Sequence, residues 1–587
     1  MAKWFEIRKG ADFHQIGKKY GISPVLARII RNREIIDEKQ IEKYLLGSLK
    51  DVYDGKLLKD MNKAVGIIHE KIRCGKKIRV IGDYDVDGIC ASYILKKGLD
   101  LCGADVDIVI PHRMKDGYGI NEQLITDAYE DKVDTIITCD NGIAAYHQIK
   151  YANSLGITCI ITDHHEVPYE MTEGKKQFIL PPAEAIIDPK QEECTYPYKN
   201  ICGAVVAWKL VLKLWEGYHI AEEDRREILE FAGIATVCDV MELLDENRII
   251  VKEALKSMKN SANLGLRSLI KIHDIHPENL SAYHLGFVLG PCFNATGRLD
   301  SAVRTLELLE CKKERETIFL AAELKKLNES RKEMTEQGVE DALCKIEEEK
   351  LDEDKVMVVY LPECHESLAG IIAGRIREKY YKPVFVLTKG EDCVKGSGRS
   401  IDSYSMYEEM SKCKELFLKF GGHKLAAGLS MEEANVEMFR KTLNDNCTLT
   451  EEELEEKVYI DLALPFACAT EEFMEELKLL EPFGTGNSKP IFAQRNVTFL
   501  SMRIMGKTAD MARFSVEDES GKRYSMILFR NLDRFLKDVE EKYGTDVLNS
   551  FINQNRNSSI KMHVIYYPSI NEYMGRREIQ YVLQSWI

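Results

Sequence analysis

The chain has 587 residues, which corresponds to about three to five domains and excludes a single small module. Its composition, with 45% hydrophobic and 30% charged residues, is that of an ordinary globular protein and excludes collagen-like or largely disordered chains. The formal net charge of -15 excludes a general attraction to polyanions, so a nucleic-acid partner would require a locally basic groove.

The sixteen cysteines are scattered, and no two form a Cys-x-x-Cys pair, which argues against a zinc ribbon or a thioredoxin-like site. Free thiols in a reducing cytoplasm are therefore favoured over a disulfide framework. The first residues, MAKWFEIRKG, contain no apolar signal segment, and no stretch approaches the roughly 18 apolar residues of a membrane helix. We expect a cytoplasmic protein with no membrane partner.

The first part of the chain is predicted to be helical, since residues 21–33 and 61–75 space their apolar residues three and four apart. Gly75 is a suitable helix stop. Beyond it, short apolar runs alternate with helix-like stretches such as 141–156, which predicts a parallel sheet covered by helices on both faces. The apolar runs are residues 78–82, 106–111, 134–140, 157–163 and 183–189.

Helices are expected over about 202–272 and again over 300–350, where the sequence becomes strongly acidic. A second mixed α/β region begins at DKVMVVYLP and includes KPVFVLTKG and KGSGRS. The tail contains several short β-like runs, which predict a small all-β barrel, with a sandwich as the alternative. The predicted domains are 1–60, helical; 61–300, parallel α/β with a helical extension; 301–350, a connecting helix; 351–450, smaller α/β; and 451–587, β-barrel.

The net negative charge is concentrated in three segments outside the predicted sheets. Residues 333–355 carry a net charge of -7, residues 451–457 carry -4, and residues 471–478 carry -3. The acidic balance is therefore mostly a property of connecting segments, and it does not argue against a nucleic-acid substrate.

Acidic residues follow four of the predicted strands at the point where each strand ends. Asp83, Asp85 and Asp87 follow the first strand, Asp140 follows another, Asp163 begins TDHHE, and Asp188 follows the last. Because the carboxyl ends of parallel strands meet at one edge of a sheet, we expect these side chains to lie together. Such a concentration of like charge is stable only if cations neutralise it.

Divalent metals are the simplest neutralising ions. Carboxylate oxygens suit Mg²⁺ or Mn²⁺, and an imidazole such as His164 favours Mn²⁺. Two such ions would activate a water and stabilise the leaving oxygen of a phosphoester. The predicted chemistry is therefore phosphoester hydrolysis.

Two simpler interpretations are weaker. DYDVDG resembles the start of a calcium-binding EF-hand loop, but the twelfth position from Asp83 is Ile94 instead of Glu. A solvated acidic turn would explain one strand end, but four strand ends with the same chemistry disfavour it. A lone histidine is usually structural, whereas an adjacent pair at a strand end favours a functional role.

Three of these segments resemble motifs of a known family. GDYDVDG, CDNG and TDHHE are similar to the first three motifs of the DHH phosphoesterases. The likeness continues, in order, through IIDPK, ICGAVVAWKL, IATVCDVMELLDENR, PCFNATGRLDSA, HESLAGIIAGRIREKYYKPVFVL, GSGRS, FGGHKLAAG and EPFGTGNSKPIF. Together these segments resemble the branch of the family that degrades single-stranded DNA.

The resemblance implies a specific ligand set for two divalent ions, Mn²⁺ or Mg²⁺. Its metal ligands would be Asp85, Asp87, Asp140, His164 and Asp239. The strand-end argument points to Asp188 and misses Asp239, so the resemblance changes the prediction. Asp83 would touch the second metal, Asp163 would orient the histidines, and His165 would contact the scissile phosphate, although a packed, structural His165 is the alternative.

The second mixed region resembles the DHH-associated domain, which would face the metal site. Gly422 and His423 of GGHKLAAG would approach a phosphate, although a Gly-Gly pair more often marks a tight turn. Ser397 and Arg399 of GSGRS, with Arg113, would hold a terminal 5′ phosphate.

The tail would be an OB-fold that binds a single strand. The candidate contacts are Arg495, Arg503, Lys507, Arg513 and Lys522. Two departures from the family pattern, Val205 and Cys364, put local packing or stacking in question but do not affect a metal ligand.

The function that the resemblance implies is metal-dependent 5′ to 3′ hydrolysis of single-stranded DNA to mononucleotides, acting in DNA repair and recombination. The alternatives are a phosphodiesterase for short oligonucleotides or cyclic dinucleotides, and a catalytically silent scaffold. A helicase and a single-strand-binding protein are candidate partners, and a monomer is expected.

Overall fold

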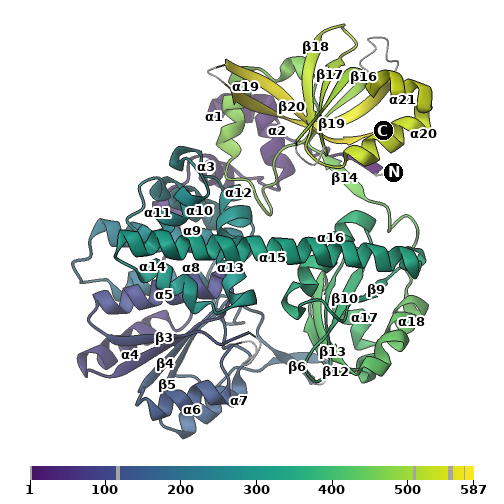
Figure 1. Cartoon of the computed structure of the whole chain (residues 1–587). Helices are drawn as coiled ribbons and strands as arrows, with labels where there is room; N and C mark the ends of the chain where they lie inside the picture. Colours follow the sequence, from purple (N-terminus) through teal and green to yellow (C-terminus); the bar gives the residue numbers. More distant parts are fainter. Residues whose placement is uncertain (1–2, 114–118, 173, 507–509, 553–559, 574–575) are drawn as a thin grey trace. The chain divides into compact units, whose positions relative to one another are not determined.

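The computed structural model describes residues 3–113, 119–172, 174–506, 510–552, 560–573 and 576–587. They form two compact units (Figure 1). One unit is Gly47–Leu454, and the other joins Met1–Leu46 to Glu455–Ile587. The predicted division into five domains remains a prediction.

The unit Gly47–Leu454 contains the predicted parallel sheet, with its strands in the order β3-β2-β4-β5-β8. The strands are β2 (Lys77–Ile81), β3 (Asp105–Val109), β4 (Thr135–Cys139), β5 (Thr158–Thr162) and β8 (Ala185–Ile187). One face packs against α4 (Met61–Arg73), α5 (Val86–Leu101) and α8 (Gly203–Leu214). The other packs against α6 (Glu122–Glu130) and α7 (Tyr146–Ser154). The largely apolar strands β4, β5 and β8 are buried, as expected for strands covered by helices on both faces.

The predicted helix over 141–156 is shorter in the structure, where α7 begins at Tyr146. Asp140 and Gly142 have φ values of 60° and 113°, which a right-handed helix cannot contain. Residue 143 instead turns its amide toward the Asp163 carboxylate, at 2.9 Å. Helix α7 thus begins late because the residues that follow β4 form a turn whose backbone contacts Asp163.

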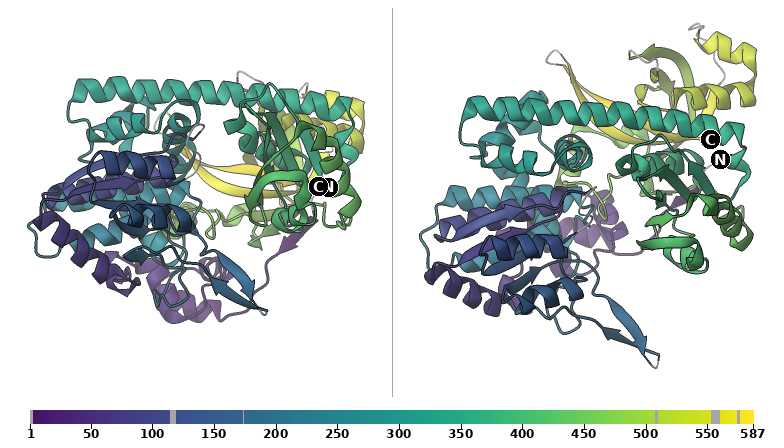
Figure 2. Two further views of the ribbon diagram at one scale, coloured as in Figure 1. Left: turned by 90° about the horizontal axis from the view of Figure 1, so that it is seen from below. Right: turned by 60° about the horizontal axis from the view of Figure 1, so that its bottom comes forward.

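Helices connect this sheet to a second, mixed sheet. They are α9 (Glu222–Cys238), α10 (Asp245–Met258), α11 (Leu264–Ile272), α12 (Ala282–His284), the π-helical turn η4 (Leu285–Leu289), α13 (Gly290–Leu299), α14 (Val303–Glu310) and α15 (Glu314–Glu348). The long helix α15 packs against α11, α13 and α14 and also against α16 (Ala369–Tyr380) (Figure 2). A short hairpin, β6 (Tyr169–Thr172) and β7 (Lys175–Phe178), projects from the first sheet.

The second sheet has the order β12-β13-β11-β10-β9. Its strands are β9 (Met357–Tyr360), β10 (Val384–Lys389), β11 (Val394–Arg399), β12 (Phe417–Gly422) and β13 (Ala426–Met431). Strand β10 pairs in parallel with β9 and antiparallel with β11. Helices α16, α17 (Met406–Ser411) and α18 (Val436–Asn446) accompany this sheet, which confirms the second mixed region.

The other unit contains a closed five-stranded barrel, so the barrel interpretation is confirmed over the sandwich. Its strands are β16 (Phe492–Met505), β17 (Met511–Glu517), β18 (Arg523–Leu528), β19 (Ile560–Tyr573) and β20 (Arg576–Trp586). The pairing of β16 with β19 closes the barrel. The unit also contains α19 (Glu471–Leu477), α20 (Leu532–Tyr543) and α21 (Thr545–Ile552).

The N-terminal segment belongs to the barrel unit. Strand β1 (Lys3–Glu6) pairs in parallel with β14 (Lys457–Ile460), and α1 (Phe13–Tyr20), α2 (Pro24–Asn32) and α3 (Glu38–Leu46) accompany them. The buried Arg33 guanidinium donates to Asp461 Oδ1 at 3.1 Å and to Asn487 Oδ1 at 2.9 Å. These buried hydrogen bonds join the two ends of the chain.

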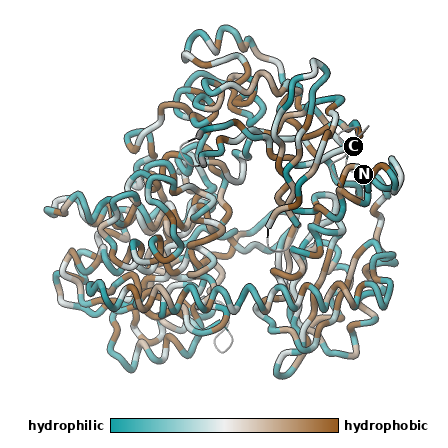
Figure 3. The backbone as a smooth tube through the Cα atoms, turned by 45° about the horizontal axis from the view of Figure 1, so that its top comes forward, coloured by the Kyte–Doolittle hydropathy of each residue, from teal (hydrophilic) through white to brown (hydrophobic). Residues whose placement is uncertain are grey.

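Hydrophobic and hydrophilic stretches alternate along the helices, as expected for helices that bury one face (Figure 3). All sixteen cysteines are free, which confirms the preference for thiols over disulfides. Across the described ranges, no helix combines the length and the apolar character needed to cross a bilayer.

A buried ion pair stabilises the first sheet's helical cover. Lys209 Nζ lies 3.0 Å from Glu246 Oε2, and the two side chains are 1% and 0% exposed. Glu246 also accepts from the Tyr196 hydroxyl at 2.6 Å. Since both charges are removed from water, neither is tolerated without its partner.

We expect Lys209→Met to lower the free energy of unfolding by about 3 to 5 kcal/mol, because it leaves Glu246 buried without its cation. Lys256→Met, which removes the exposed partner of Glu253, should change it by less than about 1 kcal/mol. Denaturant unfolding measures both. Equal losses of unfolding free energy from the two substitutions would contradict a special cost of breaking the buried ion pair.

Candidate metal centre

The functional side chains lie at the carboxyl edge of the parallel sheet, where its strand order changes direction. Strand β2 has β3 on one side and β4 on the other, so the connections that leave β2 and β4 run in opposite directions, and ligands of open α/β sheets bind at such a point. Asp83, Asp85 and Asp87 follow β2, and Asp140 follows β4. The predicted convergence of strand-end carboxylates is therefore present.

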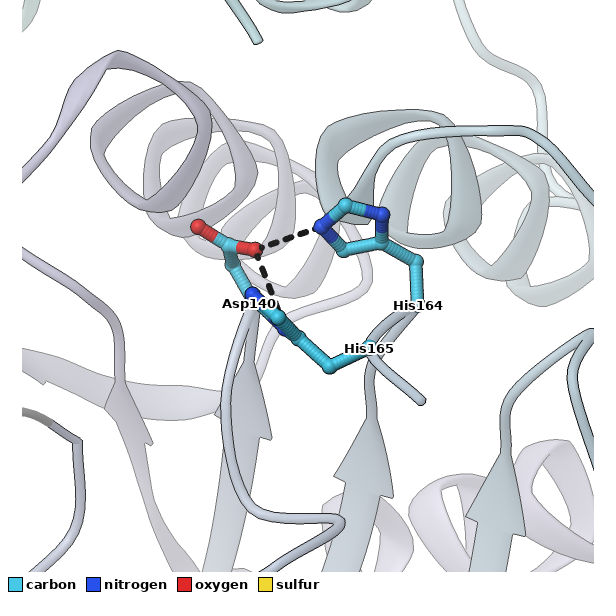
Figure 4. A group of neighbouring side chains, drawn as sticks. All are labelled: Asp140, His164 and His165. Atoms are coloured by element: carbon cyan, nitrogen blue, oxygen red, sulfur yellow. Dashed lines mark ion pairs between the residues drawn. The ribbon is translucent and has the colours of Figure 1, made fainter. Parts of the chain in front are cut away.

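Three overlapping groups of side chains in the described residues have the spacing of metal ligands. They are Asp140 with His164 and His165, Asp87 with His164 and Asp239, and Asp83 with Asp85 and Asp140. His164 Nε2 lies 3.1 Å from Asp140 Oδ1, 3.5 Å from Asp87 Oδ2 and 3.7 Å from Asp239 Oδ2. Figure 4 shows both histidine rings directed at one oxygen of Asp140.

Backbone amides and glycines hold this group together. Asp85 caps α5 and accepts from Gly88 N at 3.1 Å, while Asp87 accepts from Gly203 N and Ala204 N at 2.7 and 2.8 Å. A Cβ atom on Gly203 would lie 2.8 Å from Asp140 Cβ. Only glycine therefore allows the N-terminus of α8 to approach this closely.

The side chains present fit divalent cations. In the described part of the chain, the buried oxygens Asp83 Oδ1 and Asp239 Oδ2 have no hydrogen-bond partner. Burial, reinforced by Asp85, raises the pKa of Asp83 well above its usual value, and burial with Asp87 raises the pKa of Asp239 to about 9. Oxygen ligands that repel one another without a cation are the donor set of Mg²⁺ and Mn²⁺.

The two histidines have different surroundings. Burial lowers the pKa of His164, which favours the neutral imidazole required of a ligand. Burial would also lower the pKa of His165, but its hydrogen bond to Asp163, at 2.7 Å, raises that pKa to about 9. The His165 side chain is 45% exposed, so it is available to a substrate.

Asp163 orients this pair. Its Oδ1 accepts from the backbone amides of His164 and His165 at 2.7 and 3.2 Å, and its Oδ2 accepts from Ile143 N. Burial opposes ionisation, but the hydrogen bond and charge of His165 lower the pKa of Asp163. The carboxylate thus fixes the His165 ring directly and holds His164 through its backbone amide.

Asp188 lies at the same edge of the sheet but belongs to none of the three groups found among the described residues. Its Oδ1 accepts from Lys190 N at 2.7 Å, and burial raises its pKa to about 7. Asp239, at the C-terminus of α9, lies in the group with Asp87 and His164. The strand-end argument missed Asp239 because a helix delivers it.

A cluster of arginines lies beside the carboxylates. Arg298 of α13 is buried and close enough to Asp85 to feel its charge. Burial, together with the charges of Arg113, Arg331 and Arg399, lowers the pKa of Arg298 to about 10. Arg298 also donates to Ser367 O at 2.6 Å. Sequence reasoning missed Arg298, although NATGR was part of the motif pattern, because a lone arginine in a helix carries no signal of its own.

The predicted phosphate-binding residues occupy two places. Arg399 donates to Ser397 Oγ at 3.1 Å, and both face Gly370 at the start of α16, where an added Cβ would lie 2.8 Å from Ser397 Oγ. Arg113 packs over the Tyr84 ring at 4.9 Å. Gly422 instead ends β12 and His423 follows it, both exposed, and their roles stay predictions.

The barrel carries several of the predicted basic contacts. Arg503 and Arg513 are directly opposite on β16 and β17, and with Arg523 and Tyr524 they line a pocket of about 400 Å³. Adjacent like charges are unfavourable without an anion. Arg495 and Lys522 are exposed, whereas Lys507 lies outside the described residues.

The chain matches three known domain families. Residues 77–236 match the DHH family N-terminal domain, residues 353–448 the DHHA1 domain, and residues 460–585 the RecJ OB domain.

The single-stranded-DNA-specific exonuclease RecJ of Bacillus subtilis is 34% identical over 85% of this chain, which spans only 62% of that protein. RecJ of Salmonella typhimurium is 31% identical over 96% of both chains. The crystal structure of RecJ in complex with Mn²⁺ from Thermus thermophilus matches with a TM-score of 0.79 and 25% identity, over 100% of this chain and 79% of that one.

We expect Asp239→Asn to weaken Mn²⁺ binding by at least about tenfold. Replacing a residue that only hydrogen-bonds to a metal ligand typically lowers metal affinity about 10- to 100-fold, and Asp239 is itself a proposed ligand. Asp188→Asn, a change of the same type at the same edge, should leave binding within about threefold of wild type. Calorimetric titration with Mn²⁺ measures both. The reverse order of effects would restore Asp188 as the ligand.

Proposed function

The chain belongs to the RecJ family and is a metal-dependent exonuclease of single-stranded DNA, and we propose that it removes mononucleotides from the 5′ end in DNA repair and recombination. The observation that carries this proposal is that overlapping carboxylate and histidine groups lie near a cluster of arginines, so that sites of opposite charge are neighbours. The alternatives, an oligonucleotide or cyclic-dinucleotide phosphodiesterase and a silent scaffold, are not favoured.

Asp85, Asp87, Asp140, His164 and Asp239 would hold two divalent ions, with Asp83 touching the second. When bound, Mn²⁺ or Mg²⁺ activates a water and neutralises charge on the phosphate. Gly203 N and Ala204 N fix the Asp87 carboxylate, and the Asp85 carboxylate is held by Gly88 N, so both are oriented before substrate arrives.

His165 is proposed to contact the scissile phosphate. Its Nδ1 is engaged by Asp163, which leaves Nε2 of a half-exposed ring to donate to a phosphate oxygen. A hydrogen bond that strengthens as charge develops on that oxygen would lower the barrier.

Arg113, Arg298 and Arg399, with Ser397, are proposed to hold the terminal 5′ phosphate. Guanidinium groups match phosphate oxygens in geometry and charge, and an anion would relieve the mutual repulsion of the three arginines. A phosphate pocket beside the metal centre sets the cut one nucleotide from the 5′ end, which makes the enzyme an exonuclease.

The remaining proposals rest on the family. The arginines and Tyr524 of the barrel support a single-strand-binding surface there. We also propose that the protein is a cytoplasmic monomer that works with a helicase and a single-strand-binding protein. Pull-down with each purified partner tests the two interactions.

Asp140→Asn should reduce hydrolysis of a labelled single strand by more than about 100-fold, because it removes a carboxylate shared by two ligand groups. Asparagine keeps the size of the side chain and tolerates the left-handed backbone at this position, φ 60°, so the fold should persist. Circular dichroism checks the fold. Undiminished hydrolysis by pure, folded variant would refute the metal assignment.

Arg399→Gln should abolish the preference for a 5′ phosphate over a 5′ hydroxyl, because it removes a donor from the proposed pocket. The measurement is kcat/KM on two strands that differ only in this group. Arg304→Gln, a change of the same type at an exposed arginine of α14, should keep the wild-type preference. A preference that survives Arg399→Gln would place the 5′ phosphate elsewhere.

A further inference from the structure

Two large aromatic side chains are stacked on each other in an exposed position. Tyr283 and Phe287 have ring centroids 5.1 Å apart and planes inclined by 24°. They remain 60% and 68% exposed, respectively. A stacked pair that covers no core exposes a flat apolar surface, which usually marks a binding site.

The pair lies on a helical run that also builds the metal centre. From α12 through η4 to α13 the run is continuous, and it ends near Arg298. Phe287 and Arg298 are eleven residues apart, which corresponds to about 16 Å along a helix. The run therefore connects the arginine cluster to the aromatic pair.

Close contacts hold this run against the metal-site segments. A Cβ on Gly297 would lie 2.4 Å from Tyr84 O, and one on Gly290 would lie 2.4 Å from Cys238 Sγ. The Cys238 thiol also donates to Leu285 O at 3.5 Å. Cys238 precedes Asp239, so the turn η4 packs directly beside a proposed metal ligand.

The π-helical turn contains Phe287 and directly follows the short helix that carries Tyr283. A π turn inserts an extra residue into a helix and is frequent at functional sites. Here it includes Phe287 and packs Gly286 against Val237, where an added Cβ would meet Val237 Cγ1 at 3.3 Å. The aromatic pair is thereby fixed on a rigid element next to the metal centre.

We propose that Tyr283 and Phe287 form a stacking platform for the bases of single-stranded DNA on the 3′ side of the cleaved nucleotide. The platform deepens the proposed function and rests on it. Nucleobases are the fitting occupant because one helical run carries the aromatic pair near one end and Arg298 at the other, and between them it packs against Cys238, the neighbour of Asp239. Aromatic stacking is tolerant of sequence, since every base has a π face.

A stacking platform acts on binding and leaves the chemical step unchanged, so Tyr283 and Phe287 are positioning residues. The double variant Tyr283→Ala, Phe287→Ala should raise KM for a 5′-phosphorylated oligothymidylate by about 5- to 100-fold, with kcat nearly unchanged. Tyr283→Phe and Phe287→Trp, which keep an aromatic ring, should retain the wild-type KM.

The decisive comparison uses a second strand of equal length whose internal nucleotides are abasic. The wild type should bind it more weakly than oligothymidylate, whereas the double variant should lose most of this discrimination. Hydrolysis of 5′-phosphothymidine 3′-(p-nitrophenyl phosphate), which places thymidine in the position of the cleaved nucleotide and no base on its 3′ side, should be unchanged. Tyr129→Ala, at an exposed tyrosine near the end of α6, should behave as wild type throughout.

Two failures are distinguishable. If the wild type cut no single strand, the proposed function would fail, and the platform with it. If the wild type cut oligothymidylate and the double variant kept the wild-type KM and base discrimination, only the platform would be refuted. A loss of single-nucleotide ester hydrolysis in the double variant would also refute it, because it would show damage to the metal centre.

Discussion

Mutual repulsion among buried carboxylates is the constraint on which the rest of the site depends. Asp83, Asp85, Asp87, Asp140 and Asp239 converge on one sheet edge, where burial and neighbouring acids raise several of their pKa values. Divalent cations relieve this repulsion, and the same cations activate water and neutralise phosphate. The carboxylate repulsion that destabilises the folded chain without metal therefore also creates the metal site on which hydrolysis depends.

The chain maintains this arrangement through its backbone. Asp140 adopts a left-handed conformation that costs energy for a residue with a Cβ, and Gly203 lets α8 approach it closely. Asp163 then holds both histidines through their backbone amides and the His165 ring nitrogen, and it also accepts from the amide of Ile143. The arginine cluster has the opposite charge and lies beside these acids, which supports the proposal that it binds the terminal phosphate of the substrate.

Much of this could be predicted from the sequence, because it rests on local pattern. Uniformly apolar runs such as 157–163 predicted buried parallel strands, and acids at their ends predicted a metal edge. The sequence pattern is insufficient where distant segments come together or where the backbone adopts an unusual conformation. Asp239 comes from a helix, Arg298 lies in a motif with no distinctive chemistry, and α7 starts late because Asp140 and Gly142 adopt positive φ. The N-terminal helices join the barrel unit through contacts of long sequence separation, such as Arg33 with Asp461.

Thermal unfolding of the wild type and Asp140→Asn, in chelator and in Mn²⁺, tests the central claim most directly. In chelator the variant should be at least as stable as the wild type, because it removes one of several buried like charges. Saturating Mn²⁺ should raise Tm of the wild type well above that of the variant, since a ligand stabilises the state that binds it. A wild type that is more stable in chelator, or an equal gain from Mn²⁺ in both proteins, would contradict the account.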